Sequence, residues 1–492
     1  MQSYRTFITN SRTLLIGQVL IAAQGIILMP VIIKTAGVAI YGGYLLLATL
    51  LGFIYGISPF GVGFKCGRFL PAAETRESRR DIFYPQFYFQ LASLIIISCL
   101  FVSFYTYFDK FFLKSGLVFL KWLVFPFLLS NFFYSQAAAY FVSTHRIKYF
   151  NIVTVAFPYI NIFLILLVSS ATHRLSVNVL FVTQIISYTL LAVPLAVMVI
   201  KEIGIKFIVP EFKSLKEDIQ LGFPLRINYV TDVFLGSSDR YLIAYFISVV
   251  AVGYYNPGYA LGSLMLFLPK VSSIVLIPLL SKAIDSANEA EAYNMLNYAI
   301  KGFLLLAIPF IAGSAALSGP VLILFANTEV SREAYLVTPI IAVGTLFLGL
   351  NIILSNALWV KMKTTVMFRM NILAVAISIL LNVLFLYFYK NILVAALTSL
   401  ISYATVFVFV RRAVIKVWSL DFGVPVIIKS MAASALMAAV IFLASNYWGA
   451  KRLATAFLAV EIIIGLIVYV LGLFVFRAFS DREIVYLRKV FV

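Results

Sequence analysis

Long apolar runs separated by short polar connections extend over the whole chain. Each run holds about 20 residues, and an α-helix of that length spans roughly 30 Å of hydrocarbon. A membrane β-barrel would instead show segments of about ten residues with alternating polarity. The pattern predicts fourteen transmembrane helices, with twelve as the nearest alternative, at residues 13–33, 41–64, 85–108, 117–142, 150–171, 178–200, 221–247, 256–280, 298–320, 336–358, 370–389, 392–413, 425–447 and 454–476.

Composition supports the same class. Hydrophobic residues make up 63% of the chain and charged residues 12%, and the mean hydropathy is +1.03. In soluble domains, roughly a quarter of all residues are charged. The chain is therefore predicted to be an all-α, multi-pass membrane protein.

The distribution of basic residues predicts the orientation. With the N-terminus inside, 25 of the 38 lysines and arginines lie in cytoplasmic segments, 9 on the outer side and 4 within spans. Such a bias places the N- and C-termini in the cytoplasm and, for a bacterial protein, the chain in the inner membrane. It also explains the net charge of +19 without nucleic acid as a partner.

Several classes of chemistry find no support in the sequence. No phosphate-binding G-x-x-x-x-G-K-[ST] loop occurs, and His145 and His173 are too few for a multi-histidine metal site. Cys66 and Cys99 lie at different predicted depths, which disfavours a disulfide or redox pair. The loops leave no room for a soluble catalytic domain, and no cleaved signal peptide is expected. We predict a transporter that is not an enzyme.

The predicted span 221–247 carries the most informative residues. Arg226 and Arg240 lie fourteen positions apart, which places them roughly 40° apart around a helix and ~21 Å apart along it. Asp232 and Asp239 share another face, turned away by roughly 120 to 140°. A helix with arginines on one face suits an anionic cargo, because guanidinium groups bind phosphate oxygens in pairs.

Other charged residues extend this hypothesis. Lys270 in the next span is predicted to add a cation between the two arginines. Asp232 and Asp239 would balance these charges, or Asp232 would bind a proton or sodium ion for coupling; no other cofactor is expected. Alternatively, Arg240 lies at the outer interface and Arg226 reaches back to the inner one.

Span 117–142 contains polar residues that fit two roles. Asn131, Tyr134 and Gln136 either line a lumen for sugars or pack polar groups between helices.

A weak internal repeat predicts the organisation of the chain. The stretch 34–42, with Gly37 and Tyr41-Gly42, has a faint counterpart in Val250–Tyr255. Six spans fit in the interval between the two stretches, so the two halves would share one orientation and a pseudo-two-fold axis along the membrane normal. The predicted parts are an N-lobe at 1–205, a C-lobe at 206–416, and two extra helices with a cytoplasmic tail at 417–492.

The same motifs carry a family resemblance that covers nearly the whole chain. The sequence resembles the polysaccharide-biosynthesis branch of the multidrug/oligosaccharidyl-lipid/polysaccharide (MOP) exporter superfamily, and within it O-antigen (Wzx-type) flippases. The residues that carry it are Gly17-Gln18, Pro30, Gly37, Tyr41-Gly42, Phe60-Gly61, Arg68, Gly222-Phe223-Pro224, Asp239-Arg240, Val252-Gly253-Tyr254-Tyr255, Pro278 and Ser281.

The resemblance implies a fold similar to that of multidrug (MATE) transporters, with two six-helix lobes around a cationic cavity. It also implies an activity, the transfer of undecaprenyl-diphosphate-linked oligosaccharide from the inner to the outer leaflet by alternating access. Expected partners are this lipid-linked substrate, membrane lipids and other polysaccharide assembly proteins. The alternatives are a cation-coupled multidrug exporter of the same fold, which would want acids in its cavity, and a membrane-embedded glycan polymerase or ligase.

Overall fold

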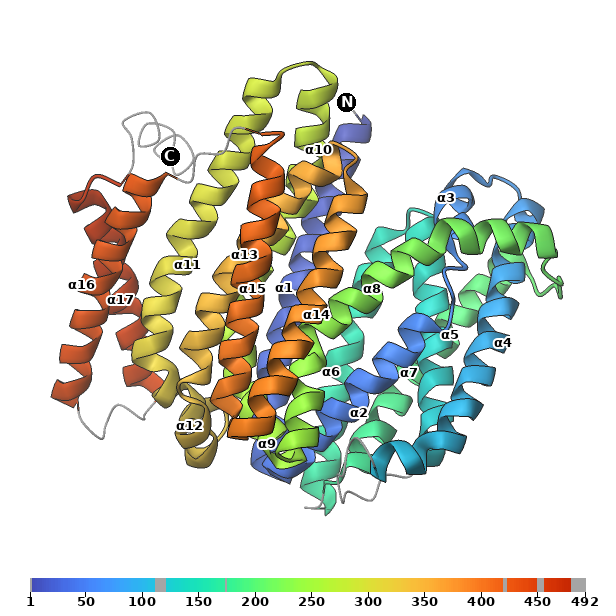
Figure 1. Ribbon diagram of the computed structural model, residues 1–492. Helices are drawn as coiled ribbons and strands as arrows, with labels where there is room; N and C mark the ends of the chain where they lie inside the picture. Colours follow the sequence, from blue (N-terminus) through green and yellow to red (C-terminus); the bar gives the residue numbers. More distant parts are fainter. Residues whose placement is uncertain (1, 111–120, 173–174, 419–422, 449–454, 479–492) are drawn as a thin grey trace. The chain divides into compact units, whose positions relative to one another are not determined.

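The computed structural model describes residues 2–110, 121–172, 175–418, 423–448 and 455–478, and every regular element within these ranges is a helix (Figure 1). Contacts divide the chain into two units, Met1–Gly253 and Tyr254–Val492. The first unit contains α1 (Gln2–Ala36), α2 (Val38–Ile57), α3 (Phe64–Phe69), η1 (Leu70–Ala72), α4 (Arg76–Phe108), η3 (Lys121–Leu123), α5 (Val124–Ser143), α6 (Ile147–Thr172), α7 (Val177–Ile203), α8 (Phe212–Phe246) and the start of α9 (Val249–Gly262). The second contains the rest of α9, η4 (Leu264–Leu266), α10 (Phe267–Asp285), α11 (Glu289–Phe325), α12 (Thr328–Ala334), α13 (Val337–Val360), α14 (Thr364–Tyr389), α15 (Ile392–Ile415), α16 (Val424–Trp448) and α17 (Thr455–Val475).

Twelve helices in the described ranges are long and apolar enough to cross a membrane, so the protein is a multi-pass membrane protein. The pattern of apolar runs predicts fourteen spans. The two that are not among the twelve coincide with α5 and α8. Both are long helices, but α5 contains Asn131 and Gln136, and α8 contains two arginines and two aspartates in its predicted span.

The predicted span at 256–280 is divided between two helices. Here α9 ends at Gly262, the short η4 follows, and α10 begins at Phe267. Pro269 supplies the reason, because proline has no backbone N–H and fits in the first turn of a helix but not in its interior. The predicted cytoplasmic tail from residue 479 onward lies outside the described residues.

Helix positions in the first unit recur in the second. Five helices have a counterpart that begins at a nearly constant interval along the chain: α2 and α9 at Val38 and Val249, α4 and α11 at Arg76 and Glu289, α5 and α13 at Val124 and Val337, α6 and α14 at Ile147 and Thr364, and α7 and α15 at Val177 and Ile392. This interval agrees with the one that separates the two glycine motifs in the sequence. The chain therefore contains two helical repeats, followed by α16 and α17, which pack against each other and against α11.

Local signals at the helix ends recur with the same spacing. Thr75 and Asn288 each cap the helix that follows, accepting hydrogen bonds from the backbone N–H groups three residues on at 3.1 and 3.2 Å. The α5–α6 turn contains His145 with φ 60, and the α13–α14 turn contains Met362 with φ 57. Both turns use a non-glycine residue in the left-handed region, where most side chains are strained. The repeat is thus visible in backbone geometry where the side chains differ.

The starts of α2 and α9 meet in a reciprocal glycine contact within the first unit. A Cβ atom built on Gly42 would lie 2.3 Å from the carbonyl oxygen of Val249, and one built on Gly253 would lie 2.2 Å from that of Val38. A Cβ atom at either position would therefore require the backbone to shift. The two motifs that reveal the repeat in sequence, Tyr41-Gly42 and Gly253-Tyr254, are therefore glycine-containing for a packing reason.

Replacing Gly42 by Ala is expected to destabilise the protein by about 1–3 kcal/mol, because the added methyl group overpacks a contact made of backbone atoms. Gly52→Ala is the matched control, since Gly52 lies in the same helix and a Cβ there meets nothing within 4 Å. Unfolding of the purified protein in detergent, followed by its tryptophan fluorescence, measures the difference. Equal stability of the two variants would contradict the contact.

Candidate functional site

The helix α8 carries the charged residues that the sequence singles out, and α2 packs against it between Arg226 and Tyr241. Arg226 donates a hydrogen bond from Nη1 to the carbonyl oxygen of Gly56 at 3.4 Å. Further along, the Tyr241 hydroxyl donates to the carbonyl oxygen of Leu46 at 3.1 Å. Phe53 and Phe234 pack edge to face, with ring centroids 5.3 Å apart. The two helices run antiparallel, with polar side chains of α8 bonded to the backbone of α2.

Gly56 in α2 allows this close approach. The ring of Tyr229 occupies the place that a Cβ on Gly56 would take, with the nearest ring atom at 2.0 Å. The same tyrosine donates a hydrogen bond to the carbonyl oxygen of Gly52, one turn earlier in α2, at 3.4 Å.

A buried carboxylate fixes the first turns of α8 to the turn before α3. Asp218 is buried, and its two oxygens accept hydrogen bonds from the backbone N–H groups of Gly63 and Lys65, each at 3.0 Å. The Lys65 ammonium group donates to Ser214 and pairs with Glu217 at 3.0 Å. This lysine lowers the pKa of the Glu217 carboxyl by hydrogen bonding and by its charge.

Two glycine-containing motifs, one from each repeat, contact each other next to Asp218. A Cβ on Gly222 would lie 1.9 Å from the carbonyl oxygen of Gly61, and one on Gly61, whose φ is 91, would lie 2.3 Å from the backbone nitrogen of Phe223. The Phe60-Gly61 and Gly222-Phe223-Pro224 motifs are therefore in direct contact.

Polar side chains of α5 lie next to Arg226. The Tyr55 hydroxyl of α2 lies close to both Arg226 and Ser135 of α5. Ser135 donates in turn to Asn131 at 3.0 Å. The structure thus brings two separately predicted residues, Arg226 and Asn131, into one polar cluster through Tyr55 and Ser135, which the sequence pattern alone did not indicate.

A second polar chain starts from Gln136. Its amide donates to Gln90 of α4 at 2.6 Å, and Gln90 donates to the carbonyl oxygen of Val62 at 2.9 Å. Tyr134, by contrast, is buried in the apolar core of the first unit, where its ring lies 5.2 Å from Tyr188 and 5.6 Å from Phe157. Of the three predicted sugar-lining residues, Tyr134 thus packs between helices.

The remaining predicted residues occupy distinct places. Arg240 is half-buried in α8, and Asp239 is buried with its carboxylate accepting the Arg240 backbone N–H at 2.8 Å. Asp232 belongs to α8, but its side chain lies outside the described part of the structure. Lys270 is exposed on α10 of the second unit. Their roles in binding or coupling stay predictions.

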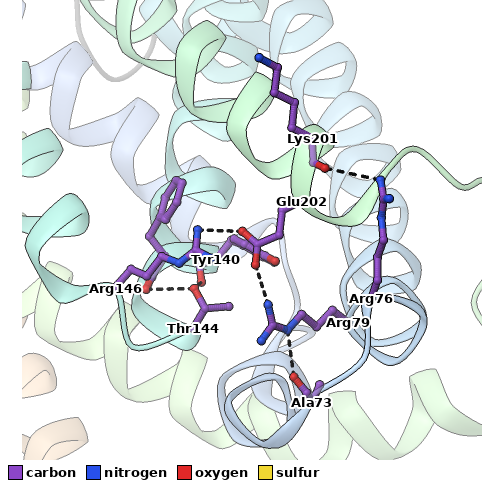
Figure 2. A network of polar contacts seen from close by, with 9 residues as sticks. Ala73, Arg76, Arg79, Tyr140, Thr144, Arg146, Lys201 and Glu202 are labelled. Atoms are coloured by element: carbon purple, nitrogen blue, oxygen red, sulfur yellow. Dashed lines mark hydrogen bonds and ion pairs between the residues drawn. The ribbon is translucent and has the colours of Figure 1, made fainter.

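An ion-pair cluster at the ends of α4, α5 and α7 was not predicted from the sequence. Glu202 pairs with Arg79 at 2.6 Å and with Arg146 at 2.8 Å (Figure 2). Arg79 also donates to the carbonyl oxygen of Ala73 at 2.9 Å. The cluster joins segments that lie far apart in the sequence, for which charge spacing within one helix gives no signal.

The second unit has an ion pair at the corresponding helix ends. Glu289 at the start of α11 pairs with Lys361 at the end of α13 at 2.6 Å. The Lys361 ammonium lies 5.8 Å from the ring centre of Trp418, which follows α15. Both repeats therefore use a charged side chain to connect the same three helix ends. Within the described residues, no group of three or more His, Cys, Asp or Glu side chains is arranged to hold a metal ion.

The sequence profile of the polysaccharide biosynthesis protein family matches residues 41–329, more than half of the 492 residues. The chain belongs to this family. The matched region includes both reciprocal glycine motifs and all of α8. No curated protein matches the chain by sequence.

Solved structures show the fold of the MOP superfamily. The lipid II flippase MurJ in an inward closed conformation aligns with a TM-score of 0.74 over 97% of this chain and 100% of that chain, at 16% identity. An inward-facing multidrug resistance MATE transporter aligns with a TM-score of 0.67 over 81% of this chain and 95% of that chain, at 12% identity. A MOP superfamily transporter from Pyrococcus furiosus aligns with a TM-score of 0.55 over 83% of this chain and 95% of that chain, at 11% identity.

Replacing Asp218 by Ala is expected to cost about 2 kcal/mol or more of stability, since two half-buried backbone N–H groups lose their acceptor. The loss of stability caused by Asp218→Asn should be smaller than that caused by Asp218→Ala, because one amide oxygen remains as an acceptor in place of two carboxylate oxygens. The adjacent Glu217→Ala removes an exposed ion pair and should change stability little. Thermal unfolding in detergent ranks the three variants, and a Glu217→Ala loss as large as that of Asp218→Ala would contradict the assignment.

Proposed function

We propose that the protein is a flippase that moves an undecaprenyl-diphosphate-linked oligosaccharide, an O-antigen or similar surface polysaccharide unit, from the inner to the outer leaflet. The observation that carries the proposal is Arg226, an arginine set among polar side chains of α2 and α5 in a membrane protein of the polysaccharide biosynthesis family. A buried or half-buried arginine is costly in a membrane and normally marks a pathway.

The chemistry of this cluster suits the two parts of such a cargo. The Arg226 guanidinium has five N–H donors, one of which donates to Gly56, and in this proposal others bind diphosphate oxygens. Sugar hydroxyls both donate and accept, as do the hydroxyls of Tyr55 and Ser135 and the amide of Asn131 beside it. In this proposal the head group binds Arg226 first, then Arg240, ~21 Å further along the same helix.

The structural neighbours favour a lipid-linked cargo over a drug. The flippase MurJ aligns with 97% of this chain, whereas the MATE transporter aligns with 81%. A drug exporter whose substrates are cations would need acids at the site, and here the described side chains of the cluster around Arg226 are those of Tyr55, Ser135 and Asn131. A glycan polymerase or ligase, the third candidate, would need a larger outer domain than the short connections predicted here provide.

The remaining parts of the proposal concern energy and placement. Asp232 or Asp239 would bind a proton or sodium ion to drive alternating access, with no other cofactor. The excess of basic residues on one side supports an inner-membrane protein with cytoplasmic termini. Other polysaccharide assembly proteins would then supply and remove the cargo.

Depletion of the protein tests the function. The expected result is accumulation of lipid-linked repeat units in the inner leaflet with loss of surface glycan, measured by extracting lipids and by labelling intact cells. Unchanged surface glycan would argue against a flippase. Unpolymerised units on the outer face would indicate a polymerase instead.

Replacing Arg226 by Ala is expected to lower transport about tenfold or more, because a charge-assisted hydrogen bond to phosphate is worth about 1.5–3 kcal/mol. Arg226→Lys should retain part of the activity, since it keeps the charge without the paired geometry. Arg412→Ala, at an exposed position in the last turn of α15, is the control. Full transport by Arg226→Ala, at equal amounts of protein in the membrane, would refute this role.

A further inference from the structure

The connection between α7 and α8 exposes large apolar side chains where no span accounts for them. Residues 205–213, here called the strap, follow the end of a candidate span at Ile203 and belong to no other. The exposed fractions of its apolar side chains are 71% for Ile205, 74% for Phe207, 72% for Val209 and 79% for Phe212. Such a run of large exposed apolar side chains would be unfavourable in water.

The strap is bonded along α4 by its backbone. The Tyr84 hydroxyl donates to the carbonyl oxygen of Gly204, and the Tyr88 hydroxyl donates to that of Lys206 at 3.2 Å. The ring of Phe207 lies 5.0 Å from the ring of Tyr88. Backbone groups near a bilayer need partners within the protein, and the tyrosines of α4 supply them here.

The contacts along α4 give the depth of the strap. Lys206 pairs with Asp81 at 3.1 Å, in the charged first turns of α4. Phe207 reaches Tyr88, two turns further into the same helix, which is about 10 Å along its axis. The strap therefore extends from the level of the charged groups toward the apolar part of α4, as a segment at the membrane interface does.

Exposed lysines lie on and beside the strap. Lys206 and Lys213 lie in it and Lys216 lies one turn later, and all three are exposed. Of the nearby acids, Asp81 is paired with Lys206 and Glu217 with Lys65, which leaves Glu211 exposed. Lysines beside inserted apolar side chains favour anionic headgroups over neutral ones.

We propose that the strap is a lipid-binding site: Ile205, Phe207, Val209 and Phe212 insert among acyl chains, while Lys213 and Lys216 bind the phosphates of anionic glycerophospholipids. The partner is the bilayer leaflet at the α7–α8 end of the first unit. The strap leads directly into α8, whose start is held by Asp218, so bound lipid holds the entry to the charged helix in place. The proposal does not depend on which cargo the protein carries.

Insertion can be measured with a fluorophore on Phe207→Cys, or on Val209→Cys as a second position. Cys99, which is exposed, is first changed to Ser, and Cys66 is buried. The protein is placed in phosphatidylcholine vesicles whose acyl chains carry bromine. Quenching by bromine and protection from aqueous iodide are expected at both positions, and the reverse at Ser286→Cys, in the exposed α10–α11 connection. Iodide quenching without bromine quenching at 207 and 209 would overturn the proposal.

Headgroup preference can be measured with spin-labelled phosphatidylglycerol in vesicles of phosphatidylcholine and phosphatidylglycerol. The double variant Lys213→Gln and Lys216→Gln should lose the preference for the anionic lipid several-fold. A matched double variant removes the same charge elsewhere, at the exposed Lys282 and Lys416, and should keep most of it. Equal losses in the two variants would show that net charge sets the preference, and would overturn the lysine assignment. An unchanged preference in the strap variant would overturn it as well.

Discussion

The charges of α8 lie within an apolar protein, where α2 packs against that helix from Arg226 to Tyr241. A lone helix with two arginines and two aspartates would be costly in hydrocarbon. In this structure Arg226, Tyr229 and Tyr241 donate to carbonyl oxygens of α2, and Asp218 accepts from the turn that follows α2. Each end of α2 also meets a glycine from the second repeat, Gly253 at its start and Gly222 after its end. If this pairing failed, the polar cluster around Tyr55 would have no fixed geometry.

Much of the fold follows from the sequence by simple rules. Apolar runs of about 20 residues mark the long helices, and Thr75, Ser176, Asn288 and Asn391 mark helix starts because their side chains accept backbone N–H groups. The interval between the two glycine motifs also recurs in the helix starts. These signals are local or periodic, so a single sequence is enough to read them.

The candidate site is less predictable, because it depends on contacts between distant segments. Arg226 is conspicuous in an apolar run, yet nothing local shows that Tyr55 and Ser135 lie beside it. The glutamines at 86 and 90 are spaced by one helical turn and could have indicated a polar face. Tyr134 shows the opposite limit, since an aromatic residue in a polar stretch turned out to belong to the core. The sequence repeats and the two contact-based units also divide the chain at different places. Helix α8 begins the second repeat, but it packs within the first unit.

The reciprocal contact between Gly42 and Gly253 has a consequence for the history of the chain. Val38 and Gly42 correspond to Val249 and Gly253 at one common offset, and each glycine faces the carbonyl oxygen of the valine that starts the other helix. Residue for residue, this is an isologous interface, the geometry that two identical subunits adopt around a two-fold axis. Duplication and fusion of a six-helix ancestor that paired with its own copy would leave such a joint. The two glycines would then be one ancestral position, kept small on both sides because each is the other's partner.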